Sequence, residues 1–282
     1  MIVRVAAARM APVLGDSAAS GARSAAAIEA AAAAGAALVV LPELCSSGYR
    51  FADATEAARA AEPVPGPTTE RWAALATGLG VVVVGGVCER DDAGRLRNSV
   101  VVVDAAGVRA VYRKLHLWGS ERELFVAGDA PAPVVETAVG RIGLAVCYDL
   151  WFPEQTRGLA LSGAEILAVP ANLTDGPRQP GLPHLDVIAA IATAHLNRVH
   201  VVLADRCGEE RGESWLGAAA VVDASGRLLA GPPAGDDAAL ALADVDLAAA
   251  CDKRWGDHND LMADRRPDCY STALVEPADA GG

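Results

Sequence analysis

The chain has 282 residues, a formal net charge of −12 and a sequence pI of about 4.8. An acidic balance of this size argues against nucleic acid or an anionic membrane surface as the main partner. Hydrophobic residues make up 52% of the chain but aromatic residues only 4%, so the core has to be built from Ala, Val and Leu.

The N-terminal segment and the cysteines favour a cytoplasmic location. Residues 1–8 contain no basic segment followed by a cleavable apolar core, and they predict a strand rather than a signal peptide. The longest apolar run, residues 30–42, is too short to span a bilayer. In a chain of this length, scattered cysteines without a C-x-x-C pair indicate reduced thiols and not a disulfide framework; they are Cys45, Cys88, Cys147, Cys207, Cys251 and Cys269.

Strands and helices alternate in the first half of the chain. Apolar runs bounded by turn residues predict strands at 2–10, 38–41 and 81–84, the last with Gly85-Gly86 behind it, and a strand pair at 98–104 and 108–114. An alanine-rich segment predicts a helix from 16 or 17 to 34, and a second helix is expected at 68–79.

The second half continues the alternation without a visible domain boundary. Strands are predicted at 134–137, 142–147, 166–170 and 200–205, and helices at 153–162 and 185–197. Strands of a more antiparallel kind follow at 217–223, 227–230 and 240–245, and the last thirty or so residues are polar and irregular. The pattern predicts one α/β domain over residues 1–282 with a mixed sheet.

Three reactive side chains stand at the ends of predicted strands. Glu43 follows residues 38–42, Lys114 ends 108–114, and Cys147 ends 142–147, just before a corner where Pro153 and Glu154 can open a helix. Strand ends are where α/β sheets present their reactive groups, so a shared site is expected. A carboxylate can take the thiol proton, and an ammonium can stabilise the thiolate and an oxyanion. This combination describes acyl transfer through a thioester.

At these positions the chain resembles the nitrilase, or carbon–nitrogen hydrolase, superfamily. The motifs that carry the resemblance occur in the order of the family; they are Leu41-Pro42-Glu43, Tyr112-Arg113-Lys114-Leu115-His116-Leu117, Cys147-Tyr148-Asp149 and Phe152-Pro153-Glu154. Supporting matches include Gly48-Tyr49, Asn98-Ser99, Pro170-Ala171-Asn172 and Asp264-Arg265-Arg266-Pro267.

The resemblance implies an α-β-β-α four-layer sandwich and a Glu–Lys–Cys triad. Cys147 is then the nucleophile, Glu43 the general base, and Lys114 the oxyanion donor together with the backbone N–H of Tyr148. A second glutamate that holds the lysine and the substrate matches Glu121, with Glu123 as the alternative. No metal or organic cofactor is implied, and His184 and His195 lack metal-ligand spacing.

The resemblance also suggests substrate contacts, for which we name Tyr49, Trp118, Tyr148, Trp151 and Asn172. Trp118 is expected as a pocket wall, with simple packing as the alternative. Specificity is expected to lie in the loops 45–56, 118–125, 172–184 and 207–215.

Hydrolysis of a small aliphatic amide is the first prediction for the reaction. Cys147-Tyr148-Asp149 is common among aliphatic and ω-amidases, whereas true nitrilases commonly carry Cys-Trp-Glu there. The segment 149–154 also resembles the Trp-containing version of N-carbamoylputrescine amidases, so N-carbamoyl amine hydrolysis ranks second and nitrile hydrolysis third. A thioester-based acyltransferase and a catalytically silent scaffold are the alternatives from other classes; the intact Glu43, Lys114 and Cys147 argue against the scaffold.

The last prediction from the sequence concerns assembly. The resemblance implies subunits that pair into an αββα-αββα homodimer or a higher homo-oligomer. Residues 251–282 form a C-terminal tail in which Trp255, Leu261, Met262 and Tyr270 stand among charges without a regular period. Apolar groups in such a segment gain little unless they lie against another surface. We therefore expect this tail at the subunit interface, with a tail folded back on its own subunit as the alternative.

Overall fold

The computed structural model describes residues 1–174, 181–233, 235 and 237–270. Its elements up to the middle of the chain are β1 Ile2–Met10, α1 Ser17–Ala33, β2 Leu38–Val40, α2 Ala54–Ala60, α3 Pro67–Leu79, β3 Val82–Arg90, β4 Leu96–Asp104, β5 Gly107–Arg113, α4 Glu121–Leu124, β6 Val134–Thr137 and β7 Gly140–Leu144. The 3₁₀ helix η1 Cys147–Trp151 follows, and then α5 Pro153–Leu161, β8 Ile166–Ala171, α6 Leu185–Asn197, β9 His200–Arg206, β10 Glu209–Glu210, β11 Glu213–Ser214, β12 Ala220–Val222, β13 Leu228–Ala230, β14 Ala239–Asp246, α7 Leu247–Cys251, β15 Arg254–Trp255, β16 Asn259–Asp260 and the 3₁₀ helix η2 Pro267–Cys269.

Twelve strands form one mixed sheet with two distinct halves. The order is β5-β4-β3-β2-β1-β9-β8-β7-β6, with β14 beside β1 and the β12–β13 pair beside β9. The neighbours β1, β2 and β3 are parallel, as are β7, β8 and β9. β1 and β9 pair only at their ends, Arg9 with Asp205 and Met10 with Arg206. The two halves therefore join at a narrow seam. The predicted antiparallel character of β12, β13 and β14 is confirmed.

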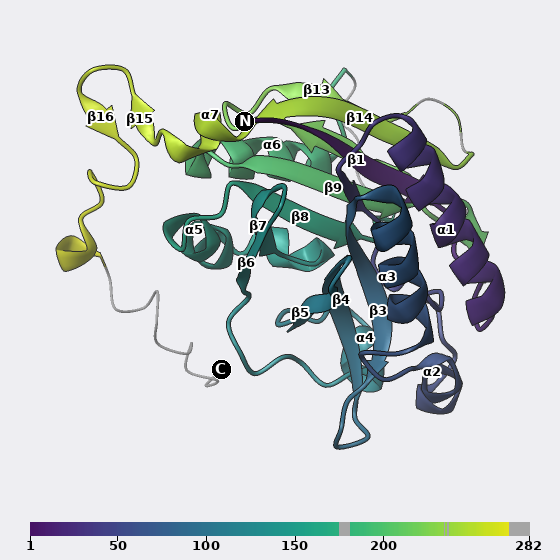
Figure 1. Cartoon of the computed structure of the whole chain (residues 1–282). Helices are drawn as coiled ribbons and strands as arrows, with labels where there is room; N and C mark the ends of the chain where they lie inside the picture. The colour runs from purple at the N-terminus through teal and green to yellow at the C-terminus, as the bar shows by residue number, and fades with distance from the viewer. Residues whose placement is uncertain (175–180, 234, 236, 271–282) are drawn as a thin grey trace.

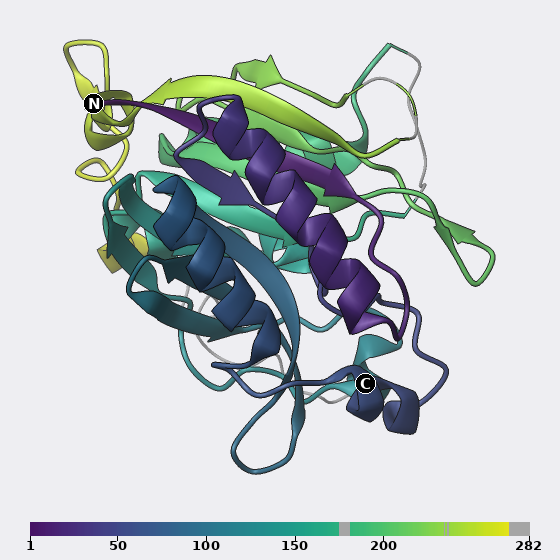
Figure 2. The same ribbon diagram turned by 45° about the vertical axis from the view of Figure 1, so that its right-hand side comes forward.

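The two halves of the sheet face each other across a buried core. This core joins Val40 and Val84 of one half with Ile166 and Val202 of the other. A second core lies beneath α1 and α3, and a third beneath α5 and α6. Figure 2 shows α1 and α3 side by side over their half of the sheet, and Figure 1 shows α5 and α6 on the opposite side. The four-layer α-β-β-α arrangement is confirmed.

Alternation along β1 shows how the sequence produces these layers. Val3, Val5 and Ala7 belong to the core between the two halves, whereas Ala6 and Ala8 belong to the core beneath the helices. Successive side chains of a strand point to opposite faces, so a strand covered on both faces must be apolar at every position. Small alanines on the helix-facing side allow close packing, and this agrees with the composition of the chain.

The predicted strand at 81–84 was too short, because β3 runs on through Gly85 and Gly86 to Arg90. A Cβ at Gly85 would lie 2.6 Å from the Trp72 ring, and one at Gly86 would lie 2.6 Å from the Cα of Glu43. These glycines do not end the strand. They allow the Glu43 turn to lie directly against it.

One further prediction at the site is corrected by the structure, and two short helices are added. The strand predicted at 142–147 ends at Leu144, and Cys147 instead opens the 3₁₀ helix η1. The short helices α2 and α4 were not predicted, because four to seven residues are too few to show a helical period. α4 matters for the site, since it begins at Glu121.

The C-terminal tail is described as far as Tyr270; residues 271–282 of this predicted interface segment lie outside the described residues. The β15–β16 hairpin projects from the body of the subunit (Figure 1). No helix in the described part of the chain combines the length and the hydropathy needed to cross a bilayer.

Candidate active site

Three segments bring a buried ion cluster together. Glu43 lies in the turn after β2, Lys114 follows the last residue of β5, and Glu121 is the first residue of α4. Lys114 Nζ lies 2.7 Å from Glu43 Oε1 and 2.8 Å from Glu121 Oε1. All three side chains are buried. One ammonium is thus shared by two carboxylates, and the sequence-predicted pair of Glu43 and Lys114 is in direct contact.

The two oxygens of Glu43 have different surroundings. Oε1 accepts hydrogen bonds from Lys114 Nζ and, at 2.7 Å, from Asn98 Nδ2. Oε2 is buried and has no hydrogen-bond partner among the described residues. An unpaired carboxylate oxygen is costly inside a protein. It is also free to take a proton.

Burial and neighbouring charges shift the pKa values of this cluster. Burial, reinforced by the charge of Glu121, raises the pKa of Glu43 to about 7, although Lys114 opposes the rise. Burial alone would lower the pKa of Lys114, but the carboxylates of Glu43 and Glu121 outweigh it, so the pKa lies above its usual value and the ammonium stays charged. Burial and the Glu43 carboxylate raise the pKa of Cys147 well above its ordinary value. The resting thiol is therefore protonated and needs a base.

Cys147 occupies a strained turn. Its φ is +46°, in the left-handed region that residues with a Cβ rarely adopt. The side chain of Asp149 holds this turn, because its Oδ2 accepts a hydrogen bond of 2.9 Å from the N–H of Val146 and another of 2.9 Å from the hydroxyl of Tyr112. Its Oδ1 lies 2.6 Å from Nδ1 of His116. One buried carboxylate thus ties the cysteine turn to the strand end that carries Lys114.

A cavity of about 250 Å³ opens beside the cysteine. This Cys147 cavity is lined by Trp118, Cys147, Tyr148, Trp151, Asn172, Leu173, Thr174, His184, Leu185 and Asp186. The volume corresponds to roughly eight water molecules. It lies below the usual range for pockets that bind drug-sized ligands, so the cavity suits a small molecule.

Four of the five expected substrate contacts, Trp118, Tyr148, Trp151 and Asn172, line this cavity. Tyr49 is not among the lining residues. Its hydroxyl donates a hydrogen bond to Glu121 Oε1, so it contacts the ion cluster.

The two alternatives for the second glutamate are separated by their positions. Glu121 is buried against Lys114 and also accepts a hydrogen bond from the N–H of Trp118, whereas Glu123 is exposed.

Several polar residues of the site were not predicted from the sequence. They are Asn98 and Asp149, which position Glu43 and the cysteine turn, and His184 and Asp186, which line the cavity. A signal existed for Asn98, since an amide inside an otherwise apolar strand needs a partner. Asp149 was visible within the Cys-Tyr-Asp motif. His184 stands at the end of the loop 172–184, which was expected to contribute to specificity, but neither it nor Asp186 was singled out from the sequence.

Within the described residues, no group of three or more His, Cys, Asp or Glu side chains could hold a metal ion.

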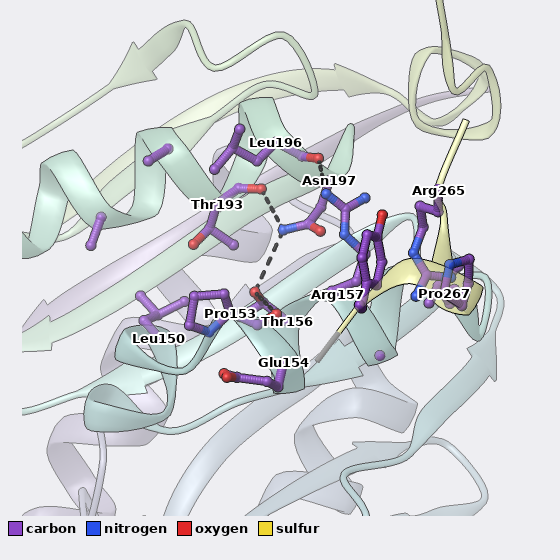
Figure 3. A pocket seen from close by; sticks show the side chains of 15 residues that line it. Leu150, Pro153, Glu154, Thr156, Arg157, Thr193, Leu196, Asn197, Arg265 and Pro267 are labelled. Atoms are coloured by element: carbon purple, nitrogen blue, oxygen red, sulfur yellow. Dashed lines mark hydrogen bonds between the residues drawn. The ribbon is translucent and has the colours of Figure 1, made fainter. Parts of the chain in front are cut away.

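A larger cavity of about 880 Å³ lies apart from Cys147, between α5, α6 and the tail. Figure 3 shows Arg265 and Pro267 of the tail beside Arg157 of α5, whose guanidinium donates a hydrogen bond of 2.7 Å to the backbone carbonyl of Leu196 in α6. Its lining includes none of Glu43, Lys114 and Cys147. We call this cavity the α5–α6 groove. In the described residues the tail therefore contacts its own subunit.

Comparisons with known proteins agree with this geometry. The family model described as carbon-nitrogen hydrolase matches residues 4–253. A protein of Pyrococcus abyssi named nitrilase is 37% identical over 237 residues, covering 84% of this chain and 87% of the relative. The N-carbamoylputrescine amidase of Solanum lycopersicum is 35% identical over 260 residues, covering 86% and 85%.

Solved structures share the fold. A double mutant of the amidase from Nesterenkonia sp. AN1, in complex with acrylamide, has a TM-score of 0.76 at 25% identity and covers 94% of this chain and 95% of that one. Another structure of that amidase carries the acetamide moiety of fluoroacetamide on its active-site cysteine. With the family match spanning most of its length, this chain belongs to the carbon–nitrogen hydrolase, or nitrilase, superfamily.

Proposed function

We propose that this protein hydrolyses the carbon–nitrogen bond of a small aliphatic amide through a thioester on Cys147. The observation that carries the proposal is the buried cluster of Glu43, Lys114 and Glu121, in which Glu43 keeps one unpaired oxygen, next to a cysteine at the wall of a small cavity. A protonated thiol, a carboxylate with a pKa near 7 and a fixed ammonium are the parts that acyl transfer requires.

In the acylation half of this reaction, Glu43 Oε2 takes the proton of Cys147 as the sulfur attacks the amide carbon. The oxyanion that forms is stabilised by Lys114 Nζ and by the N–H of Tyr148, which lies in the first turn of η1 and has no partner within that helix. The proton on Glu43 then passes to the leaving nitrogen. The carbon–nitrogen bond breaks, ammonia departs and the acyl group remains on sulfur.

In the deacylation half, water replaces ammonia. Glu43 takes a proton from the water, whose oxygen attacks the thioester carbon at the same oxyanion site. The carbon–sulfur bond breaks, the thiol recovers its proton, and a carboxylic acid leaves. The sum is one amide and one water converted into one acid and one ammonia. Glu43 thus serves both halves with one oxygen.

Ammonia release from a panel of short primary amides tests this proposal. Hydrolysis of at least one of them by the wild type, with an acyl group on the Cys147 peptide in mass spectra of the quenched reaction, would support it. Ammonia release by Cys147→Ala at a rate comparable to that of the wild type would refute the thioester. An acyl product on an added amine in place of water would instead indicate an acyltransferase.

A second candidate function is hydrolysis of an N-carbamoyl amine. Trp151, which belongs to the segment that resembles N-carbamoylputrescine amidases, lines the Cys147 cavity, and the Solanum lycopersicum relative carries that name. The same cysteine chemistry would then release ammonia, carbon dioxide and a free amine. Detection of the amine product separates this function from that of a simple amidase. Nitrile hydrolysis stays third, although the Pyrococcus abyssi relative is named nitrilase.

We also propose that the protein forms a homodimer or a higher homo-oligomer, in which the tail contributes to the contact. The α5–α6 groove carries the exposed side chains of Leu161 and Leu196, and the tail exposes Trp255 and Tyr270. An apolar face of this kind is covered at low cost by a second copy of the same chain. The tail's contacts within its own subunit leave much of these side chains exposed.

A further inference from the structure

The β10–β11 hairpin is fastened to the segment that follows Glu43. Glu210 of β10 accepts hydrogen bonds through Oε2 from the backbone N–H groups of Tyr49, at 3.0 Å, and Arg50, at 2.7 Å. Gly48 permits this approach, because its φ is +83° and a Cβ there would lie 2.7 Å from Glu210 Oε1. One side chain of the hairpin therefore fixes the backbone that carries Tyr49.

Glu210 is itself held by a buried ion pair. Arg206, the last residue of β9, donates from Nη2 to Glu210 Oε1 at 2.8 Å and from Nη1 to Oε2 at 3.1 Å. The two side chains are only 1% and 5% exposed. Two parallel hydrogen bonds between a guanidinium and a carboxylate fix the geometry of both groups. The position of the Glu210 carboxylate is therefore set by the sheet.

The ring of Tyr49 is positioned by the same pair through an aromatic contact. The guanidinium of Arg206 lies over the Trp215 ring, 4.6 Å from its centroid. Trp215 in turn contacts the Tyr49 ring edge to face, with centroids 5.3 Å apart. Backbone and ring of Tyr49 are thus both held from the β9–β10 side.

The hydroxyl of Tyr49 ends at the buried ion cluster. It donates to Glu121 Oε1, the oxygen that also lies 2.8 Å from Lys114 Nζ. Burial and the charge of Glu121 raise the pKa of Tyr49 well above its ordinary value, so the hydroxyl keeps its proton and remains a donor near neutral pH. Since Glu121 is one of the two carboxylates that bind Lys114, this hydroxyl helps to determine where the ammonium lies.

We propose that Glu210 is a positioning residue for the reaction. Held by Arg206, it fixes Tyr49. Tyr49 in turn holds Glu121 and, with it, the Lys114 ammonium. This inference rests on the proposed carbon–nitrogen hydrolysis, in which that ammonium stabilises the oxyanion. Glu210 and Tyr49 lie outside the described lining of the Cys147 cavity, so the effect falls on the chemical step and not on substrate binding.

Two variants break this connection at different points. Glu210→Gln removes the charge that pairs with Arg206, and its single amide oxygen cannot serve both Arg206 and the two backbone N–H groups. Tyr49→Phe keeps the ring and the backbone contacts and removes only the hydroxyl. A misplaced catalytic group can cost up to about 100-fold in rate, so each variant should lower kcat about tenfold and leave KM within about twofold. Ammonia release from the substrate that the wild type hydrolyses best measures both constants.

A double-mutant cycle gives a readout that a merely structural role would not move. If Glu210 acts through Tyr49, the kcat of the double variant should equal that of Tyr49→Phe alone, because the hydroxyl is already absent. Independent effects would instead multiply to a loss of about 100-fold.

Asp223→Asn is the matched control. Asp223 also pairs with an arginine four residues away, Arg227, and accepts from two backbone N–H groups, those of Ser225 and Arg227. Its turn between β12 and β13 lies outside the described lining of the Cys147 cavity, so kcat and KM should stay within about twofold of the wild type.

Two further measurements cover failure of a variant to fold or to find a substrate. If Glu210→Gln leaves too little folded protein, Trp215→Phe replaces it in the cycle, because it keeps the buried ion pair and changes the ring that contacts Tyr49. Alkylation of Cys147 by iodoacetamide, followed on its peptide by mass spectrometry, needs no substrate. Its rate depends on the thiolate that Lys114 stabilises, so it should fall in Glu210→Gln and Tyr49→Phe and not in Asp223→Asn.

The outcomes separate the two levels of the proposal. If the wild type hydrolyses none of the amides or N-carbamoyl amines, the proposed function fails, and the alkylation rates alone decide whether Glu210 positions the ammonium. The positioning role is refuted if folded Glu210→Gln keeps the kcat and alkylation rate of the wild type. Losses that multiply in the double variant, or an equal loss in Asp223→Asn, would refute it as well.

Discussion

Replacing Glu43 by glutamine gives the sharpest test of the proposed chemistry. The amide oxygen of the new side chain can still accept from Lys114 Nζ and Asn98 Nδ2, the two donors that Glu43 Oε1 has now. The position of Oε2, which has no partner among the described residues, would hold an amide nitrogen that cannot take a proton. The variant should therefore fold and lose the base. Loss of a general base lowers kcat by about 100- to 10,000-fold.

The pKa of Glu43 also predicts how the variant responds to pH. A base with a pKa of about 7 must be deprotonated to act, so kcat/KM of the wild type should rise with pH with a midpoint near 7, and this limb should be absent in Glu43→Gln. The free energy of unfolding should instead fall as the pH rises. A carboxyl whose pKa is higher in the folded than in the unfolded state stabilises the fold only while it is protonated. Its contribution is complete below pH 4.5 and is lost as the pH rises to about 7.

The rise from 4.5 to about 7 corresponds to a loss of about 3 kcal/mol of unfolding free energy. Glu43→Gln removes that loss, because its side chain does not titrate. Asp205, whose pKa burial raises to about 8, titrates in the same direction in both proteins and cancels in the comparison.

Urea unfolding of both proteins at pH 4.5 and pH 8, with ammonia release across the same range, provides the measurement. Equal pH dependence of stability in the two proteins, together with a retained acid limb in the variant, would refute the assignment of Glu43 as the buried base.

Three further predictions concern the other parts of the site and the assembly. Cys147→Ala should unfold at a temperature close to that of the wild type and lose more than about 1000-fold in kcat; comparable turnover would remove Cys147 from the nucleophile role. Lys114→Arg keeps a charge but replaces a compact ammonium by a planar fork, so kcat measured by ammonia release should fall about 100-fold or more, and an unchanged kcat would contradict an oxyanion role. Light scattering should find at least a dimer for the full chain and weaker association for a chain that ends at about residue 250; a monomeric, active full-length enzyme would refute the dimer, and an unchanged oligomer after truncation would exclude the tail from the contact.

The sequence predicted most strands and helices of this fold because their signals are local, whereas the four-layer arrangement was implied by the family resemblance. An apolar run such as residues 2–10 must be covered on both faces, and the alanine-rich segment that follows has few alternatives to a helix. The positions of Glu43 and Lys114 followed from strand ends, since chain direction places such residues at the edge of a sheet.

The corrections arise where a tertiary contact decides the local structure. Gly85 and Gly86 indicated the end of a strand, but only the packed structure reveals that Trp72 and the Glu43 turn occupy the space of their missing side chains. The place of Asp186 in the lining of the Cys147 cavity, beside Trp151, is of the same kind. It depends on how α6 lies beside η1, and no periodic pattern encodes that arrangement.

The unfavourable features of the molecule gather where the chemistry is proposed. Leu44, directly after Glu43, and Cys147 are two of the four non-glycine residues in the described chain with a positive φ. Beside them lie two carboxylates on one buried ammonium and an oxygen without a partner among the described residues. Each feature costs free energy on folding. The cores that surround the site must offset this cost. What the folded state gains in return is a thiol, a base and a cation that need little rearrangement when a substrate enters.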